Sequence, residues 1–235
     1  MDKPAISITN LKHRYQGDWH LHIPELTLNF GHIYGLIGRN GAGKSSLMKF
    51  IAGAEQPLTG HIACASTRVG HIHPQTAYPG YLRVGQLASL FRSRSSQTQS
   101  TWDDARFTEI VNVFNIDSQQ QYRNLSTGER AGLHLAIMLS QHPQIWLLDE
   151  PTLGIDVVAI NHCLEILSQM FMDDQPCVLF STHQMYELER LTDQVLILAE
   201  GRLTWHGETE SLHDIEPTFR HAIEAMLQPA KEASV

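Results

Sequence analysis

The residues with the clearest chemistry lie between positions 38 and 46. They form the run Gly-Arg-Asn-Gly-Ala-Gly-Lys-Ser-Ser, which follows an apolar stretch and precedes a stretch with helical character. Glycines let backbone N–H groups curl around an anion, and the positive end of the following helix points at the same place. The lysine of such a loop reaches the β- and γ-phosphates, and the following hydroxyl ligates Mg²⁺. We therefore expect a nucleotide-phosphate loop made by Gly38, Asn40, Gly41, Gly43, Lys44, Ser45 and Ser46.

Two carboxylates supply the complementary chemistry. The apolar residues 145–148 predict a buried strand, and Asp149 and Glu150 follow at its carboxyl end. Ligands of open parallel sheets bind at that edge. We expect Asp149 to be a direct or indirect partner of Mg²⁺, and Glu150 to orient or deprotonate a water that attacks the γ-phosphate.

The elements that must position these groups follow an alternating order. Helical character fills residues 81–141, with one polar interruption at 93–101 that we expect to be a loop. Strand–helix alternation before and after this block predicts a mostly parallel sheet covered by helices, with the block inserted as a subdomain. The remaining predicted strands are 5–9, 25–30, 33–37, 61–65, 68–72, 145–148, 177–181 and 194–199, and the remaining predicted helices are 44–52, 157–172 and 184–191.

Composition narrows the class of protein. The 235 residues are 42% hydrophobic and carry a formal net charge of −8, so they suit one globular domain and argue against general nucleic-acid binding. No run reaches the roughly 18–20 apolar residues of a spanning helix, and no secretory signal is visible. The odd set of cysteines, Cys64, Cys163 and Cys177, favours a reduced compartment.

Alternating histidines raise the question of a metal site. His20 and His22, and likewise His71 and His73, would share a face if they lie on strands. No cysteine or acidic residue stands at the usual ligand spacing from either pair. Ordinary structural histidines are therefore favoured over a metal centre.

A third motif links these features to a known family. Leu125-Ser126-Thr127-Gly128-Glu129 precedes a predicted helix, with Ser126 as its N-cap. Taken alone, this run would be an ordinary helix start. Together with the phosphate loop and the carboxylates it resembles the signature of the ATP-binding-cassette (ABC) ATPases, and the resemblance covers nearly the whole chain.

The resemblance implies an α/β fold. Its expected parts are a P-loop NTPase core with a mostly parallel sheet, an N-terminal antiparallel β-subdomain and an inserted α-helical signature subdomain. It divides the single domain 1–235 into a core at 1–75 and 142–207, a helical subdomain at 76–141 and a C-terminal helical tail at 208–235, whose helix is predicted at 217–227.

Further site residues are implied by the same resemblance. Gln75 resembles the loop glutamine that reaches Mg²⁺ and water, and His183 resembles the switch histidine that contacts the γ-phosphate. Asp156 resembles the aspartate that communicates across a dimer, although it also fits a helix N-cap. Tyr15 resembles the aromatic residue that stacks on adenine, with Trp19 as a rival.

The signature implies a second copy of the chain. A helix start with Ser126 and Gly128 is an anion site of its own, and two such sites suit a head-to-tail pair that sandwiches two ATP molecules. The signature departs from the usual L-S-G-G-Q at Thr127 and Glu129, and Gly132 stands where a basic residue is common. We expect these changes to weaken or slow the signature without abolishing it.

The resemblance implies a function and two possible settings. The favoured one is a Mg²⁺-dependent ATPase that energises a membrane transporter, as a homodimer or heterodimer with separate transmembrane permease subunits. It would lie at the cytoplasmic face of the inner membrane. Only 28 residues follow Gly207, which favours exporter-type relatives over importers with an added regulatory domain. The alternative is a soluble or regulatory ABC ATPase acting on an envelope, ribosomal or DNA machine.

Overall fold

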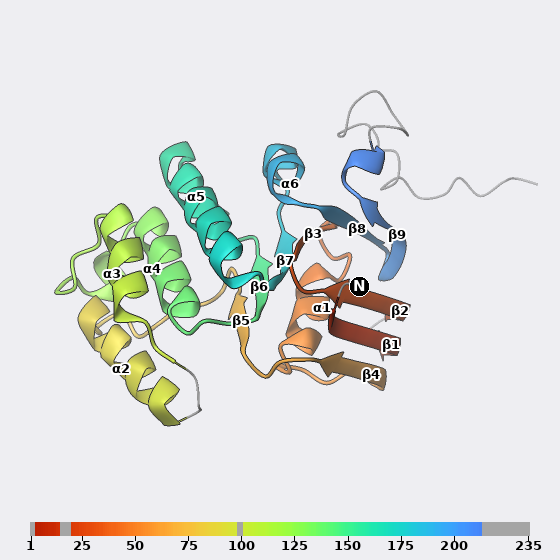
Figure 1. Ribbon diagram of the computed structural model, residues 1–235, viewed down its shortest axis with the longest axis horizontal. Helices are drawn as coiled ribbons and strands as arrows, with labels where there is room; N and C mark the ends of the chain where they lie inside the picture. The colour runs from red at the N-terminus through yellow and green to blue at the C-terminus, as the bar shows by residue number, and fades with distance from the viewer. Residues whose placement is uncertain (1–2, 15–19, 98–100, 213–235) are drawn as a thin grey trace, which may run out of the picture. The chain divides into compact units, whose positions relative to one another are not determined.

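The computed structural model describes residues 3–14, 20–97 and 101–212 (Figure 1). The chain divides into two compact units. We call residues 1–65 and 177–235 the first unit, and residues 66–176 the central unit. The described helices do not include one that combines the length and the apolar composition of a membrane span.

The first unit is built on a mixed sheet. Its strand order is β4-β1-β2-β9-β8-β3-β7, with helices α1 and α6 in the same unit. The strands are β1 (Pro4–Arg14), β2 (His20–Asn29), β3 (His32–Ile37), β4 (Thr59–Cys64), β7 (Cys177–Ser181), β8 (Gln194–Ala199) and β9 (Arg202–Glu208), and the helices are α1 (Lys44–Ile51), α6 (Met185–Leu191) and the short η2 (Glu210–Leu212).

Strand direction separates two parts of this sheet. β3 pairs in parallel with both β7 and β8, and its buried apolar residues read as the continuous run typical of a covered parallel strand. β1 pairs antiparallel with β2 and β4. The parallel core and the N-terminal antiparallel part confirm the predicted fold class.

Strand β9 was missing from the sequence prediction. It forms an antiparallel hairpin with β8, and its residues alternate between exposed and half-buried. The hairpin turn uses Glu200 and Gly201, both with positive φ. A Cβ at position 201 would lie 1.8 Å from the His20 carbonyl oxygen, so the turn requires glycine there.

The central unit combines a short parallel pair of strands with helices. β5 (Val69–Ile72) pairs with β6 (Ile145–Asp149), and every residue of β6 is buried. The helices are α2 (Val84–Gln97), α3 (Asp104–Val113), η1 (Tyr122–Asn124), α4 (Thr127–Leu139) and α5 (Val157–Asp174). The predicted loop at 93–101 was wrong over its first half, because α2 continues to Gln97 and buries the polar Ser95.

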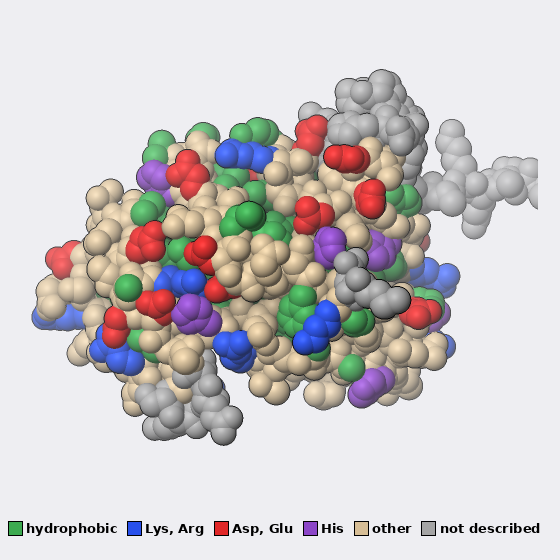
Figure 2. All heavy atoms as spheres, viewed as in Figure 1, with side chains coloured by type: hydrophobic (Ala, Val, Ile, Leu, Met, Phe, Trp, Pro, Cys, Tyr) green, Lys and Arg blue, Asp and Glu red, His purple; other side chains and the backbone are tan. Residues whose placement is uncertain are grey.

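A charged cluster ties three of these helices together. Arg106 on α3 donates from Nη1 to Asp174 Oδ2 of α5 over 2.6 Å and to the Leu139 carbonyl of α4 over 3.3 Å. His142 Nε2 lies 3.3 Å from Asp103 Oδ2, and Asp103 also caps α3 by accepting from the Arg106 N–H. Over the helices at the left of Figure 2, acidic and basic side chains are interspersed on the face drawn.

Candidate functional site

The predicted phosphate loop connects β3 to α1 in the first unit. Gly41 and Gly43 have φ values of 82° and 109°, a region that other residues enter only with strain. A Cβ at Gly38 would lie 2.4 Å from the Leu198 carbonyl oxygen, so glycine is needed at the start of the loop as well. Asn40 and Gly41 form its exposed tip, and Ser45 and Ser46 stand half-buried on the first turn of α1. The loop has the backbone freedom and the helix start that an anion site needs.

The lysine of the loop is held by the loop itself. Lys44 is 6% exposed, and its Nζ donates to the Gly38 carbonyl over 2.7 Å. Gly43 is the N-cap residue of α1 and makes no side-chain cap hydrogen bond. The ammonium group and the first amides of α1 therefore form a local positive field in an otherwise acidic protein.

His183 follows the neighbouring strand of the same unit. Leu36 of β3 pairs with Ser181 of β7, so the phosphate loop and the His183 loop both leave the carboxyl ends of paired parallel strands. His183 is exposed. The phosphate loop and His183 thus occupy the edge at which open α/β sheets bind ligands.

A buried carboxylate that sequence reasoning missed supports the His183 loop. Thr182 donates its hydroxyl to Glu187 Oε2 over 2.6 Å, and the Gln184 N–H donates to Thr182 Oγ1 over 3.1 Å. Glu187 is 0% exposed. The sequence of this short helix is largely polar, so nothing in it predicted that Glu187 would be buried.

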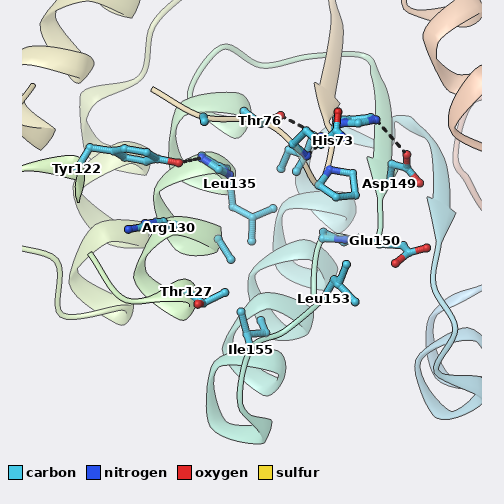
Figure 3. Close-up of a pocket in the computed structure, with 17 residues that line it drawn as sticks. His73, Thr76, Tyr122, Thr127, Arg130, Leu135, Asp149, Glu150, Leu153 and Ile155 are labelled. Carbon is cyan, nitrogen blue, oxygen red and sulfur yellow. Dashed lines mark hydrogen bonds and ion pairs between the residues drawn. The ribbon is translucent and has the colours of Figure 1, made fainter. Parts of the chain in front are cut away.

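The carboxylates of the central unit line a cavity of about 340 Å³ (Figure 3). Gln75, Asp149 and Glu150, which are three of the predicted site residues, all contribute to the wall of this cavity. The register of β5 on β6 explains this meeting, because Ile72 pairs with Leu148 and both strands end at the same edge. The rest of the wall comes from residues 72–77, the first turns of α4 and the loop at 149–155.

The two acidic residues differ in environment. Asp149 ends the buried strand β6 and is 1% exposed. Glu150 is half-buried and has φ of 50°, a left-handed conformation that costs a non-glycine residue of order 1 kcal/mol or more. The chain therefore turns sharply between them and presents Glu150 to the cavity from the loop.

The signature forms a complete capping box at the start of α4. Ser126 Oγ accepts from the Glu129 N–H over 3.2 Å, and the Glu129 carboxylate accepts from the Ser126 N–H over 2.7 Å. This confirms Ser126 as the N-cap. The acidic residue at position 129 is therefore engaged with its own helix end.

The glycines of the signature region pack closely. A Cβ at Gly128 would lie 3.2 Å from Ala159 Cβ, and a Cβ at Gly132 would lie 2.3 Å from the Phe114 ring. The contact at Gly132 explains why the usual basic residue is absent from this position, because no larger side chain fits against Phe114. Thr127 reaches the cavity of Figure 3, whereas Ser126 and Gly128 are not among the residues of its wall.

Asp156 is the N-cap of α5, as its sequence position also allowed. Its Oδ1 accepts from the N–H groups of Val158 and Ala159 over 2.9 and 3.0 Å. Gly154 before it has φ of 74° and gives the loop its turn.

Aromatic residues close one side of the cavity. Tyr122 Oη lies 3.1 Å from His134 Nε2, and the Arg130 guanidinium lies 5.4 Å from the Tyr122 ring centroid. Burial, with a smaller contribution from Arg130, lowers the pKa of His134 to about 4. Burial likewise raises the pKa of Tyr78, whose ring meets those of Tyr122 and His134. His134 is therefore neutral at pH 7.

Some of the predicted features, among them the helix at 217–227, lie outside the described residues. Tyr15, and its rival Trp19, lie outside the described residues. The ring centroids of His71 and His73 are 5.9 Å apart, and within the described ranges no three His, Cys, Asp or Glu side chains gather in a way that could hold a metal ion.

Comparison with known proteins identifies the class. The family model described as ABC transporter matches residues 21–153, which include the phosphate loop, both carboxylates and the signature. The chain belongs to this family. It is an ATP-binding subunit of the ABC ATPase type, an enzyme that binds nucleotide and hydrolyses ATP in transport.

Individual relatives agree with this class. A zinc import ATP-binding protein of Saccharophagus degradans is 31% identical over 220 residues, which cover 90% of this chain and 82% of the relative. A solved ATP-binding subunit of an ABC transporter has 20% identity and a TM-score of 0.83, over 95% of this chain and all of the other. A dimeric bacterial ABC cassette has 18% identity and a TM-score of 0.75, over 86% of this chain and 98% of the other.

Proposed function

We propose that this ATPase energises a membrane transporter by closing and reopening as a pair of subunits, each bound to separate transmembrane permease chains at the cytoplasmic face of the membrane. One observation carries the proposal furthest. Gln75, Asp149 and Glu150 line a single cavity, so the groups for metal and water stand together in the central unit. The phosphate loop of the first unit supplies the group that holds the triphosphate.

Glu150 is the proposed catalytic residue. It follows the end of a buried strand and is one of the residues that line the cavity. Its carboxylate accepts a proton from the attacking water or orients that water toward the γ-phosphate. His183 and Lys44 stabilise the charge that the γ-phosphate oxygens carry. Most of the rate then comes from positioning and charge stabilisation.

Mg²⁺ fits the donors that the chain offers. The Ser45 hydroxyl, the Gln75 amide oxygen and an Asp149 carboxylate oxygen are hard oxygen ligands, which this ion prefers. Asp149 is almost fully buried, and a divalent cation is a natural partner for a carboxylate in that environment. These residues would hold Mg²⁺, and the ion would supply positive charge to offset that of the β- and γ-phosphates.

The signature is proposed to act on the nucleotide of a second copy. Ser126 and Gly128 stand at the exposed start of α4, a helix of thirteen residues. Its first amides and the Ser126 hydroxyl are donors for a γ-phosphate. Asp156 would carry the state of one site to the other. The dimeric cassette among the solved structures supports a paired arrangement.

The permease is proposed to dock on the helical part of the central unit. A hollow of about 630 Å³ lies along α2, and Leu90 in its wall is 58% exposed. Its wall comprises Arg83, Gly85, Gln86, Ser89, Leu90, Ser118 and Gln119. An apolar side chain at the rim of such a hollow suits the apolar face of a short helix.

The direction of transport is decided by the permease, because the ATPase subunit does not touch the solute. Relatives named for import, the zinc import protein among them, give no support to the exporter-type prediction. The proposal therefore concerns ATP-driven transport without an assigned direction.

The test compares ATP turnover and ATP binding in matched variants. Glu150→Gln keeps the size of the side chain but removes its basicity, so turnover falls at least about 100-fold while ATP still binds. Lys44→Ala weakens ATP binding itself. Turnover is measured by phosphate release and binding by a fluorescent ATP analogue. An unchanged turnover in Glu150→Gln would overturn the role of this residue.

A further inference from the structure

We propose that His73 is a positioning residue, which holds the Asp149 carboxylate and the backbone at Gln75 in one arrangement and so shapes the Mg²⁺ site. This inference rests on the roles proposed above for Asp149 and Gln75. His73 was noticed in the sequence only as half of a histidine pair. In the structure its ring contacts the Gln75 backbone through one nitrogen and approaches Asp149 with the other, and Figure 3 draws the approach to Asp149.

The first contact fixes the loop. His73 Nδ1 accepts a hydrogen bond from the Gln75 N–H over 3.1 Å. The His73 N–H donates to Thr76 Oγ1 over 3.1 Å, and the Thr76 N–H donates to the His73 carbonyl over 2.8 Å. These bonds close a tight turn, so the imidazole and the backbone of Gln75 keep a constant relation.

The second contact faces the carboxylate. His73 Nε2 lies 3.8 Å from Asp149 Oδ2, and the two side chains are 19% and 1% exposed. Because Nδ1 accepts a hydrogen bond, the proton of a neutral ring lies on Nε2 and is directed toward Asp149. Because both side chains are largely shielded from water, the electrostatic attraction between the Nε2–H group and the carboxylate is stronger than it would be in water.

The backbone register also brings His73 and Asp149 near one another. Ile72 pairs with Leu148 in the parallel register of β5 on β6. His73 directly follows the last residue of β5 and Asp149 is the last residue of β6, so this register brings the two residues close together. Groups that orient a metal-binding carboxylate from outside typically change metal affinity 10–100-fold when they are removed.

Two substitutions separate the contacts. His73→Asn keeps an acceptor near the place of Nδ1 for the Gln75 N–H but has nothing that reaches Asp149. His73→Gln extends an amide N–H toward the place of Nε2. We expect the Mg²⁺ concentration for half-maximal binding of a fluorescent ATP analogue to rise about 10-fold in His73→Asn and much less in His73→Gln. His61→Asn, an exposed histidine of β4, is the matched control and stays at the wild-type value.

Asp149→Asn distinguishes failure of this inference from failure of the proposed site. If Asp149→Asn leaves the Mg²⁺ requirement unchanged, both are overturned. Two outcomes overturn only the inference, provided that Asp149→Asn raises the Mg²⁺ requirement. In the first, His73→Asn has the wild-type Mg²⁺ requirement. In the second, His73→Asn and His73→Gln raise the Mg²⁺ requirement equally.

A measurement on the wild-type protein guards against variants that fold poorly. Nitrogen-15 NMR of the His73 imidazole without metal or nucleotide is expected to show the proton of the neutral ring on Nε2. A proton on Nδ1 would contradict the hydrogen bond from Gln75 and overturn the proposal.

Discussion

Glu150 and His134 illustrate how local environment sets the properties of single residues in the central unit. Glu150 is held in a left-handed conformation at the end of a buried strand, a kind of strain that concentrates at functional sites. His134 is kept neutral by its burial beside Tyr122 and Arg130. Neither property is encoded by residue type alone.

The buried His134 predicts how stability depends on pH. Its pKa is about 4 in the folded protein and lies near 6.5 in an unfolded chain, so the unfolded state binds more protons between these values. Its contribution to stability is complete above pH 6.5 and falls by up to about 1.4 kcal/mol per pH unit down to pH 4. Urea unfolding of the wild type and of His134→Gln between pH 4 and 8 measures the difference. A constant difference in unfolding free energy across this range would contradict the assignment.

At the scale of residues, the sequence indicated the motifs but not the neighbouring side chains that contact them. The phosphate-loop residues and the two carboxylates could be found because their spacing follows from the chemistry of a triphosphate. The contacts of Glu187 and His73 could not be found in this way, because the fold brings the partner of each one near. Thr182 lies on a loop beside α6, and Asp149 is 76 residues from His73 along the chain.

Helix packing at Gly132 allows a prediction at the scale of elements. Gly132→Ala places a Cβ 2.3 Å from the Phe114 ring, so overpacking costs about 1–3 kcal/mol even though alanine favours a helix. Thermal or urea unfolding measures this loss. In a Phe114→Ala background the same substitution costs much less, because the Cγ and Cδ atoms that the new Cβ would meet are gone. Equal losses in the two backgrounds would show that the ring is not the cause.

The Arg106 cluster gives a second prediction at this scale. Arg106 is 9% exposed at its side chain and pairs with Asp174, which is 21% exposed, so Arg106→Met removes the guanidinium partner of a half-buried carboxylate and costs about 2–3 kcal/mol. The exposed pair of Arg92 and Asp104 provides the control, and Arg92→Met leaves the unfolding midpoint unchanged. The account of the cluster would be wrong if the two variants lost the same stability.

Elements were predicted well where one face is continuously apolar and poorly elsewhere. Strand β6 and helix α5 have such apolar runs, and both were found close to their observed bounds. The end of α2 was missed because Ser93–Gln97 is polar in sequence, yet packing extends the helix and buries Ser95. Strand β9, which lies between β2 and β8 in the sheet, was missed because its residues only alternate between exposed and half-buried.

At the scale of the whole molecule, the predicted site residues are distributed over both units. The predicted phosphate loop belongs to the first unit, and the predicted carboxylates and signature belong to the central unit. Sequence resemblance predicted the class correctly, whereas relatives named for import give no support to the exporter-type prediction. The role proposed for the signature calls for a second copy of the chain.

Assembly with nucleotide is the most direct test of this central claim. The Glu150→Gln chain, which binds ATP without turning it over, is passed through a sizing column with light-scattering detection in Mg²⁺ and either ATP or ADP. We predict a mass of twice 26.5 kDa in ATP and a mass of 26.5 kDa in ADP, with the added Lys44→Ala substitution giving the single-chain mass in both. A single-chain mass in saturating ATP, with ATP shown to be bound, would contradict the account.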